Sequence, residues 1–310
     1  MTKLVYCIFY GISTLPFKVL YAISDLLMPL LYHVIRYRRG VVRRNLVTSF
    51  PEKSTREVVA IEKEFYHWFC DYFLESIKLL SISDKELNRR LRIKNPEVHE
   101  QWYLKGRNTA GFLGHYCNWE WLSRVGKDIN PERRVFLIYD PLHSKAIDYL
   151  FLRIRSYAPT GVPTPKKDIL RQLLTWKREG RFSLSGYIAD QSPKWENIHL
   201  WLPFLNHPET PVFTGAERIA RKMNDAVYYV KMTRPRRGYY DVEYVPITDD
   251  PASLPDGEVT RRFFKMLEQS IKEAPAYYLW THNRWKRTKE EFDRLYTVEN
   301  GKVKRRADNA

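Results

Sequence analysis

An apolar segment near the N-terminus limits what this chain can fold into more than any other feature of its sequence. Residues 4–35 carry few charges, chiefly Lys18 and Asp25, and about 20 apolar residues are enough to cross the hydrocarbon core of a bilayer. Pro16 and Pro29 interrupt the segment, so an amphipathic, half-inserted hairpin fits nearly as well as a spanning helix. The apolar region is too long for a cleaved signal peptide. The remaining alternative is an N-terminal helix buried on a soluble core.

A cluster of arginines follows the apolar segment directly. Such a cluster beside an apolar segment usually lies on the cytoplasmic side, against anionic lipid headgroups. We therefore expect residues 1–35 to anchor the protein at the cytoplasmic face of a membrane. The cluster consists of Arg36, Arg38, Arg39, Arg43 and Arg44.

The charge balance of the whole chain also points to an anionic partner. Lys and Arg number 52 against 36 Asp and Glu, a formal net charge of +16, which suits nucleic acid, a membrane surface, an acidic protein or a phosphorylated substrate. No RNA- or DNA-binding motif accompanies the charge, so we expect no nucleic-acid partner. Hydrophobic residues at 44% can build a large core, which excludes a mainly disordered chain. Three cysteines exclude a disulfide framework, and the scattered histidines predict no metal site.

The rest of the chain alternates between apolar strands and amphipathic helices. A capping box at Ser54 and Glu57 predicts the start of a helix that runs to about residue 80. This alternation predicts an α/β fold with a mixed, largely parallel sheet flanked by helices, in one domain over residues 36–300. Residues 301–310 are expected to form a flexible basic tail. Strands are expected at 109–113, 135–139, 183–189, 226–232 and 239–245, and helices at 144–157, 166–179, 211–223 and 258–272.

The chemistry is concentrated in residues 114–121, GHYCNWEW. His115 and Glu120 are five residues apart, about 140° on a continuous helix, so they meet only if His115 ends a strand and Glu120 lies in the helical turn that follows. In that geometry the carboxylate accepts from one ring nitrogen of His115 and fixes the tautomer. The other nitrogen can then take a proton from a hydroxyl, as a general base does in acyl transfer.

Two other readings of this motif remain open on spacing alone. A histidine and a glutamate at this spacing arise by chance in many chains, and the pair is then a structural histidine near a surface glutamate. Cys117 could instead be a nucleophile with His115 as its base, and this is the less favoured reading. The histidine motif alone is therefore weak evidence.

The motifs together resemble those of the bacterial lipid A late acyltransferases, the lauroyl and myristoyl transferases of lipopolysaccharide assembly. The likeness extends from the apolar segment to Trp285. It rests on residues 37–46 (YRRGVVRRNL) with 49–54 (SFPEKS), on 114–120 as the His-x4-acidic catalytic motif, on Arg155 with Ser156, on 189–191 (ADQ), and on 214–221. The segment after Arg155 departs from the usual family pattern.

The resemblance implies a glycerolipid-acyltransferase-like fold with an N-terminal membrane-associated helix, at the cytoplasmic face of the inner membrane. It implies transfer of an acyl chain from acyl carrier protein to a hydroxyl of a phosphorylated glucosamine-based lipid. No cofactor is expected beyond the thioester, which acyl-CoA could also supply. Another glycolipid or a lysophospholipid is the alternative acceptor. A non-catalytic basic membrane-binding protein is the alternative of a different class.

The same resemblance assigns roles to individual residues. His115 is expected to be the general base and Glu120 its orienting partner. Arg155 is expected to point inward, toward a phosphate or the thioester oxygen, while Arg153 stays solvated. Asp190 is expected to hold Arg155 or a loop, and the alternative for it is a helix or turn cap. Asn118 completes the supporting set.

Overall fold

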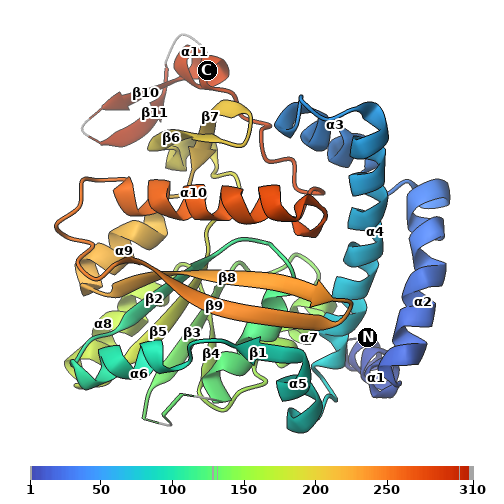
Figure 1. Ribbon diagram of the computed structural model, residues 1–310. Helices are drawn as coiled ribbons and strands as arrows, with labels where there is room; N and C mark the ends of the chain where they lie inside the picture. Colours follow the sequence, from blue (N-terminus) through green and yellow to red (C-terminus); the bar gives the residue numbers. More distant parts are fainter. Residues whose placement is uncertain (1, 128, 131, 300, 307–310) are drawn as a thin grey trace.

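The computed structural model describes residues 2–127, 129–130, 132–299 and 301–306, and its centre is a seven-stranded sheet (Figure 1). The strand order is β1-β9-β8-β2-β5-β3-β4, and all neighbours are parallel except the antiparallel pair β8 and β9. The predicted α/β fold with a largely parallel sheet is therefore confirmed. The strands are β1 Leu91–Ile93, β2 Thr109–Leu113, β3 Arg134–Tyr139, β4 Gly161–Pro165, β5 Ser183–Ile188, β8 Ala226–Arg236 and β9 Tyr239–Thr248.

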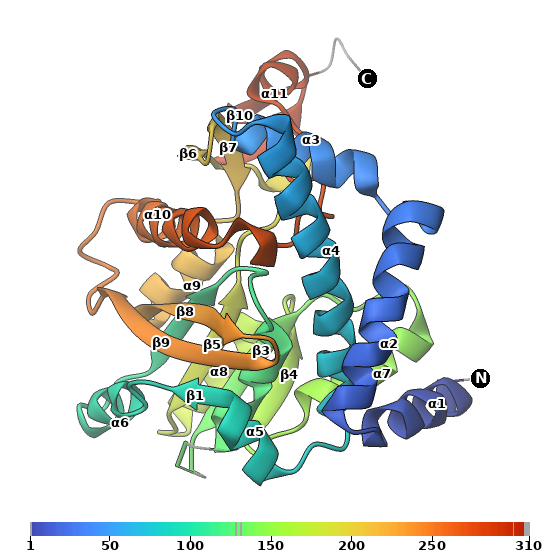
Figure 2. The same ribbon diagram turned by 45° about the vertical axis from the view of Figure 1, so that its right-hand side comes forward.

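Helices surround this sheet. Figure 1 shows α10 above β8 and the long α4 along one side of the sheet, with α2 on the outer side of α4. The turned view of Figure 2 shows α1 at the foot of the same side, next to α7. The α-helices are α1 Thr2–Thr14, α2 Phe17–Pro29, α3 Arg39–Ser49, α4 Thr55–Lys78, α5 Asp84–Arg90, α6 Glu97–Leu104, α7 Lys145–Arg155, α8 Ile169–Arg178, α9 Gly215–Met223, α10 Glu258–Glu273 and α11 Lys289–Leu295.

Helix α4 begins where its capping box predicts. The Glu57 amide donates to Ser54 Oγ at 3.3 Å, and the Ser54 amide donates to Glu57 Oε2 at 2.8 Å, so both orphan donors are satisfied. The helix ends at Lys78, two residues before the predicted end. Phe65 and Trp68 of its aromatic stripe are fully buried and form part of the main core, whereas Phe73 is 37% exposed.

The N-terminal apolar segment forms two helices that meet at Pro16, and α2 continues into a π-helical turn, Leu30–Ile35. One face of α2 packs on α4, while the other face exposes large apolar side chains, such as Leu26 at 75% and Val34 at 72%. Among the described residues, Phe17–Ile35 is the one helix that is long and apolar enough to cross a membrane, and 22% of it is buried. This helix is therefore not the buried core helix of the alternative reading.

Three local expectations need correction. Pro211 was expected in a helix but lies in β7 (His207–Val212), which pairs with β6 (Leu200–Phe204), and α9 begins only at Gly215. The tail was expected to be flexible from residue 301, yet β11 (Lys302–Arg305) pairs with β10 (Tyr296–Glu299), which satisfies its backbone groups. Residues 307–310 lie outside the described residues. Strand β4 was not predicted because it contains two prolines, which a sheet tolerates only at an edge such as this one.

Candidate active site

The candidate site lies at the carboxyl ends of two neighbouring parallel strands. Strands β2 and β5 are in register from Thr109 to Leu113, and the Ala189 amide extends the pairing by donating to the Leu113 carbonyl at 3.0 Å. Chain directions are the same in both strands, so the residues just beyond them emerge at one edge of the sheet. His115 follows β2 and Asp190 follows β5, and His115 Nδ1 lies 2.7 Å from Asp190 Oδ1.

The surroundings of His115 determine its tautomer. A carboxylate only accepts hydrogen bonds, so Nδ1 carries the proton and Nε2 keeps its lone pair. That lone pair faces the Gln191 side-chain amide, whose nitrogen lies 3.1 Å from Nε2. Burial favours the neutral form of Asp190, but the charge and hydrogen bonds of His115 and the charge of Arg284 outweigh it and lower the pKa of Asp190. The arrangement therefore holds an ionised carboxylate against an imidazole whose second nitrogen is ready to accept a proton.

A glycine allows helix α10 to approach this strand end. A Cβ on Gly114 would lie 2.7 Å from Leu267 Cδ1, a residue of α10. Leu267 is fully buried in the main core, so it has little room to move away. Any side chain at position 114 would therefore displace either α10 or the backbone that carries His115.

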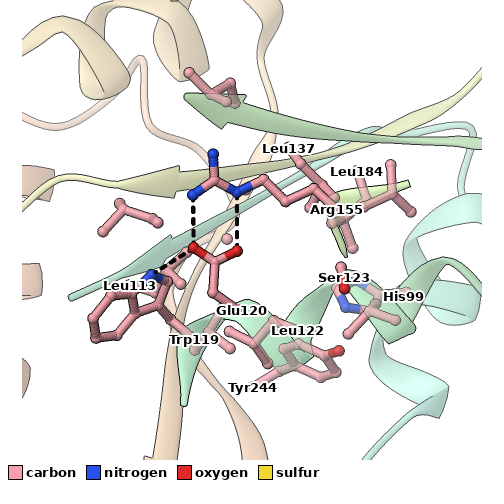
Figure 3. A pocket seen from close by; sticks show the side chains of 17 residues that line it. His99, Leu113, Trp119, Glu120, Leu122, Ser123, Leu137, Arg155, Leu184 and Tyr244 are labelled. Carbon is pink, nitrogen blue, oxygen red and sulfur yellow. Dashed lines mark hydrogen bonds and ion pairs between the residues drawn. The ribbon is translucent and has the colours of Figure 1, made fainter. Parts of the chain in front are cut away.

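The expected contact between Glu120 and His115 is not formed. Its two carboxylate oxygens accept from Arg155, Oε2 from Nε at 2.9 Å and Oε1 from Nη2 at 2.6 Å (Figure 3). Trp119 Nε1 also donates to Oε1 at 3.2 Å. The reason is local: Cys117 adopts a left-handed conformation with φ 52°, and the 3-10 helix Trp119–Lys127 that follows turns Glu120 away from the imidazole. The orienting partner of His115 is thus Asp190, and the expected pair with Glu120 is wrong.

The two arginines at the end of α7 separate as expected. Arg155 points inward and its side chain is 17% exposed, whereas Arg153 is exposed. Burial disfavours the charge of Arg155, but the bidentate Glu120 carboxylate more than compensates and raises the pKa of Arg155. Asp190 does not hold Arg155, as one expectation had it, because its carboxylate is bound to His115.

An apolar cavity of about 70 Å³ adjoins the Glu120–Arg155 pair. Figure 3 shows the two charged side chains facing each other among the apolar side chains that line it. Gly111 of β2 and Gly186 of β5 line the cavity and contribute no side chain to it. The apolar walls come from Leu113, Trp119, Leu122, Val125, Val135, Leu137, Ile138, Leu184, Ile188 and Val230. Its apolar lining suits hydrocarbon, and its volume suits a short part of a hydrocarbon chain.

Comparison with known proteins now decides the family. The sequence profile of the bacterial lipid A biosynthesis acyltransferases matches residues 1–287. This chain belongs to that family. It is also similar to the lipid A biosynthesis lauroyltransferase of Escherichia coli (strain K12), with 22% identity over 276 residues, which cover 88% of this chain and 87% of that protein. The resemblance drawn from the motifs is confirmed: the protein is an acyltransferase of lipid A biosynthesis, which implies a lipid A acceptor and an acyl donor.

Two buried residues of the 114–121 segment hold this loop of the acyltransferase in place. Asn118 is fully buried, and its Nδ2 donates to Glu75 Oε2 on α4 at 2.9 Å. Cys117 is also fully buried, and burial raises the pKa of its thiol well above the ordinary value. A buried, protonated thiol is a poor nucleophile, so the structure gives no support to the Cys117 alternative.

Sequence reasoning missed three residues around Asp190. Gln191 faces His115, as described above. His282 Nε2 accepts from the Ser192 amide at 3.2 Å, and burial lowers the pKa of His282 to about 4, so its ring is neutral. Arg284 is 1% exposed and places a buried positive charge near Asp190. One signal in the sequence could have indicated the contact between Asp190 and His115. Each of the two residues follows a predicted strand, and neighbouring parallel strands bring such residues together.

Proposed function

We propose that this enzyme transfers a fatty acyl chain from the thioester of acyl carrier protein to a hydroxyl of a phosphorylated glucosamine-based lipid. His115 Nε2 takes the hydroxyl proton as the oxygen attacks the thioester carbonyl, and the new C–O bond forms. The C–S bond then breaks, and the leaving thiolate receives the proton from the imidazolium. The observation that carries the proposal is the His115–Asp190 pair, which leaves Nε2 as a proton-accepting nitrogen. The ring of His115 lies 4.9 Å from that of Trp119, which lines the apolar cavity.

Asp190 and Gln191 prepare His115 for this step. The buried carboxylate of Asp190 holds the productive tautomer and stabilises the imidazolium that forms during the attack. The Gln191 amide contacts Nε2, the nitrogen to which the acceptor hydroxyl gives its proton.

Arg155 fits the thioester oxygen better than a phosphate. Its Nε and Nη2 are bound to Glu120, which leaves Nη1 as the donor with no hydrogen-bond partner among the described residues. Because the guanidinium adjoins the apolar cavity, it can donate to the oxygen on which charge develops while the acyl chain occupies the cavity. Glu120 then acts by fixing the direction of Arg155.

The surface charge and the N-terminal helices support the cellular setting we propose, the cytoplasmic face of the inner membrane. A net charge of +16 favours encounter with an acidic carrier protein and with anionic lipid headgroups. Helix α2 and its π-helical continuation bury Phe17, Leu20 and Tyr32 on the folded domain and expose apolar side chains on the other face. A helix with one face committed to the domain suits insertion into the membrane interface rather than a full span.

An assay of the purified enzyme in detergent micelles tests this function. The donor is offered as acyl carrier protein or CoA thioester, and the acceptor as a phosphorylated glucosamine lipid or a lysophospholipid. We expect the carrier-protein thioester and the glucosamine lipid to be preferred, and His115→Ala to reduce the rate by about 10²–10⁴. His67→Ala, at an exposed histidine of α4, is the matched control and should keep wild-type activity. A folded His115→Ala enzyme with near-normal turnover would contradict the general-base assignment.

A further inference from the structure

A second apolar groove lies between α4 and the C-terminal end of α2, outside the catalytic cavity. Its volume is about 340 Å³, within the range of small-molecule sites. Part of it is open, since Leu30 is 44% and Ile35 58% exposed. The groove is lined by Leu27, Leu30, Leu31, Ile35, Tyr37, Phe69, Cys70 and Phe73, and the proposed mechanism uses none of these residues.

Cations border one end of this groove. The chain passes from Ile35 and Tyr37, which line it, directly to Arg38, which has φ 52° and donates from Nη1 to the Thr281 carbonyl at 3.0 Å. Arg39 and Arg43, one and five residues further on, are both bound to the Glu62 carboxylate. Arg38 itself has no carboxylate partner among the described residues.

Two further cations join Arg38 from the segment that contains Thr281. Lys286 and Arg287 likewise have no carboxylate partner in the described part of the chain. This segment lies beside the start of α3, because Arg38 donates to the Thr281 carbonyl and Asn45 Nδ2 donates to the His282 carbonyl at 2.9 Å. In keeping with this proximity, burial and the charges of Arg287 and Arg38 lower the pKa of Lys286. Three neighbouring cations without a counter-charge form a site for an anion.

Chains of contacts connect both the groove and the cations to His115. From the groove, ring contacts run from Phe69 to Tyr72, from Tyr72 to Trp119 at 4.2 Å between centroids, and from Trp119 to His115 at 4.9 Å. On the cationic side, Arg287 Nη1 lies 3.5 Å from Ser192 Oγ. Ser192 directly follows Gln191, the residue that contacts the imidazole.

We propose that the groove holds an acyl chain of the acceptor lipid while Arg38, Lys286 and Arg287 bind its phosphate. This inference rests on the proposed function and names the acceptor's subsite. The pairing of an apolar groove with a cationic end favours an amphipathic phosphate ester over an acidic protein surface, which brings no alkyl chain to the groove. Arg155 is free of this task because Glu120 occupies it.

The cationic half is tested with the double variant Arg38→Gln/Lys286→Gln. We expect the KM for the phosphorylated acceptor to rise about ten-fold, since charge-assisted hydrogen bonds are lost, with the KM for the acyl donor unchanged. On an acceptor whose phosphates have been removed, the variant and the wild type should have equal KM values. The control Lys105→Gln/Arg178→Gln removes the same two charge types from exposed sites elsewhere and should leave both KM values unchanged.

Three outcomes would overturn the cationic half. A raised KM for the carrier-protein donor alone would assign these cations to the carrier protein. An equal rise in KM for the phosphorylated and the dephosphorylated acceptor would show that the cations do not bind the phosphate. An unchanged KM for both acceptors would show that the cations do not bind the acceptor.

The apolar half is tested with Leu30→Gln against Leu26→Gln. Both leucines are exposed on α2 or its continuation, but only Leu30 lines the groove. Flotation with phosphatidylcholine vesicles should weaken to a similar extent in both, whereas the acceptor KM in micelles should rise only for Leu30→Gln. Equal KM values for the two variants would show that the groove merely contacts the membrane.

A measurement of acceptor binding without turnover tests the subsite independently of the proposed function. Calorimetry of the full-length His115→Ala protein in zwitterionic micelles measures its affinity for the phosphorylated acceptor without turnover. Binding that is lost on adding Arg38→Gln/Lys286→Gln supports the subsite even if wild-type enzyme failed to acylate that acceptor. No loss of binding would overturn the subsite while leaving catalysis by His115 intact.

Discussion

The edge of the parallel sheet and the N-terminal helices differ in how far their functional side chains are buried and paired. At the sheet edge, Asp190 is 2% exposed and bound to His115, and Glu120 is bound at both oxygens by Arg155. On α2 and its π-helical continuation, Leu26 and Val34 are mostly exposed. Chemistry at His115 needs one fixed tautomer and therefore buried, paired partners, whereas contact with lipid needs apolar area that the fold leaves uncovered.

Asp190→Asn should break the sheet-edge arrangement most severely. An asparagine amide can donate to His115 Nδ1, which turns the imidazole to the wrong tautomer and removes the charge that stabilises the imidazolium. We expect kcat to fall by about 10³–10⁴ with little change in KM, as for an aspartate in this position of a hydrolase triad. Stopped assays of kcat and KM check this, and a thermal melt confirms folding. Activity close to wild type would show that Asp190 does not orient His115.

Arg155→Lys should have the next largest effect on kcat, and it tests the paired arrangement at the sheet edge from a second residue. Lysine keeps the charge but loses the bidentate fork to Glu120, so we expect a fall in kcat of about 10–100-fold. The defect should be equal on phosphorylated and dephosphorylated acceptors, because Arg155 serves the thioester. Arg153→Lys is the matched control and should be mild. A defect that vanishes on the dephosphorylated acceptor would make Arg155 the phosphate ligand.

Glu120→Gln tests the same pair from its other side. The uncharged amide accepts only one of the two Arg155 hydrogen bonds and no longer offsets the buried charge. Breaking a buried ion pair costs about 3–5 kcal/mol of stability, and with Arg155 17% exposed we expect the lower end. Urea unfolding and kcat should both show the loss. Wild-type values for both would make the pair dispensable.

On the N-terminal side, Leu26→Glu/Val34→Glu should weaken membrane binding without unfolding the domain. Both side chains are exposed, so the substitutions place charge on the lipid-facing surface and leave the contact between α2 and α4 intact. We expect a clear shift of the protein from the membrane to the soluble fraction after ultracentrifugation. Removing residues 1–35 altogether is a poorer test, because it also uncovers the α4 surface that Leu20 and Tyr32 cover. Full membrane retention of the double variant would place the binding elsewhere.

The smallest expected effect is a loss of stability in mild acid. Burial lowers the pKa of His99 to about 3 and contributes most to lowering that of His282 to about 4, while an unfolded histidine titrates near 6.5. Below pH 6.5 these histidines are protonated in the unfolded chain but not in the folded protein. The free energy of unfolding therefore falls as the pH drops toward their folded-state pKa values. For the buried His99 the slope is at most about 1.4 kcal/mol per pH unit. Urea midpoints at pH 7, 6 and 5 should decline, and less steeply in His99→Gln; equal slopes would contradict this account.

Local sequence rules determined a large part of this protein. The capping box at Ser54 started α4 where predicted, the apolar run 109–113 is a buried strand, and alternating strands and helices gave a largely parallel sheet. Helical spacing also separated Arg155 from Arg153. Each of these depends on neighbours within a few residues, so the information lies in the local sequence.

Only the tertiary structure decided which carboxylate serves His115. Glu120 is five residues away but faces Arg155, because the left-handed Cys117 and the short 3-10 helix after it redirect the chain. Asp190 is 75 residues away but adjacent in space, because β2 and β5 pair in parallel and end at the same edge. Strand pairing over such a separation depends on how the whole sheet assembles, which no local pattern encodes. The same holds for Arg38 and Lys286, which became neighbours only when α3 packed beside the C-terminal segment.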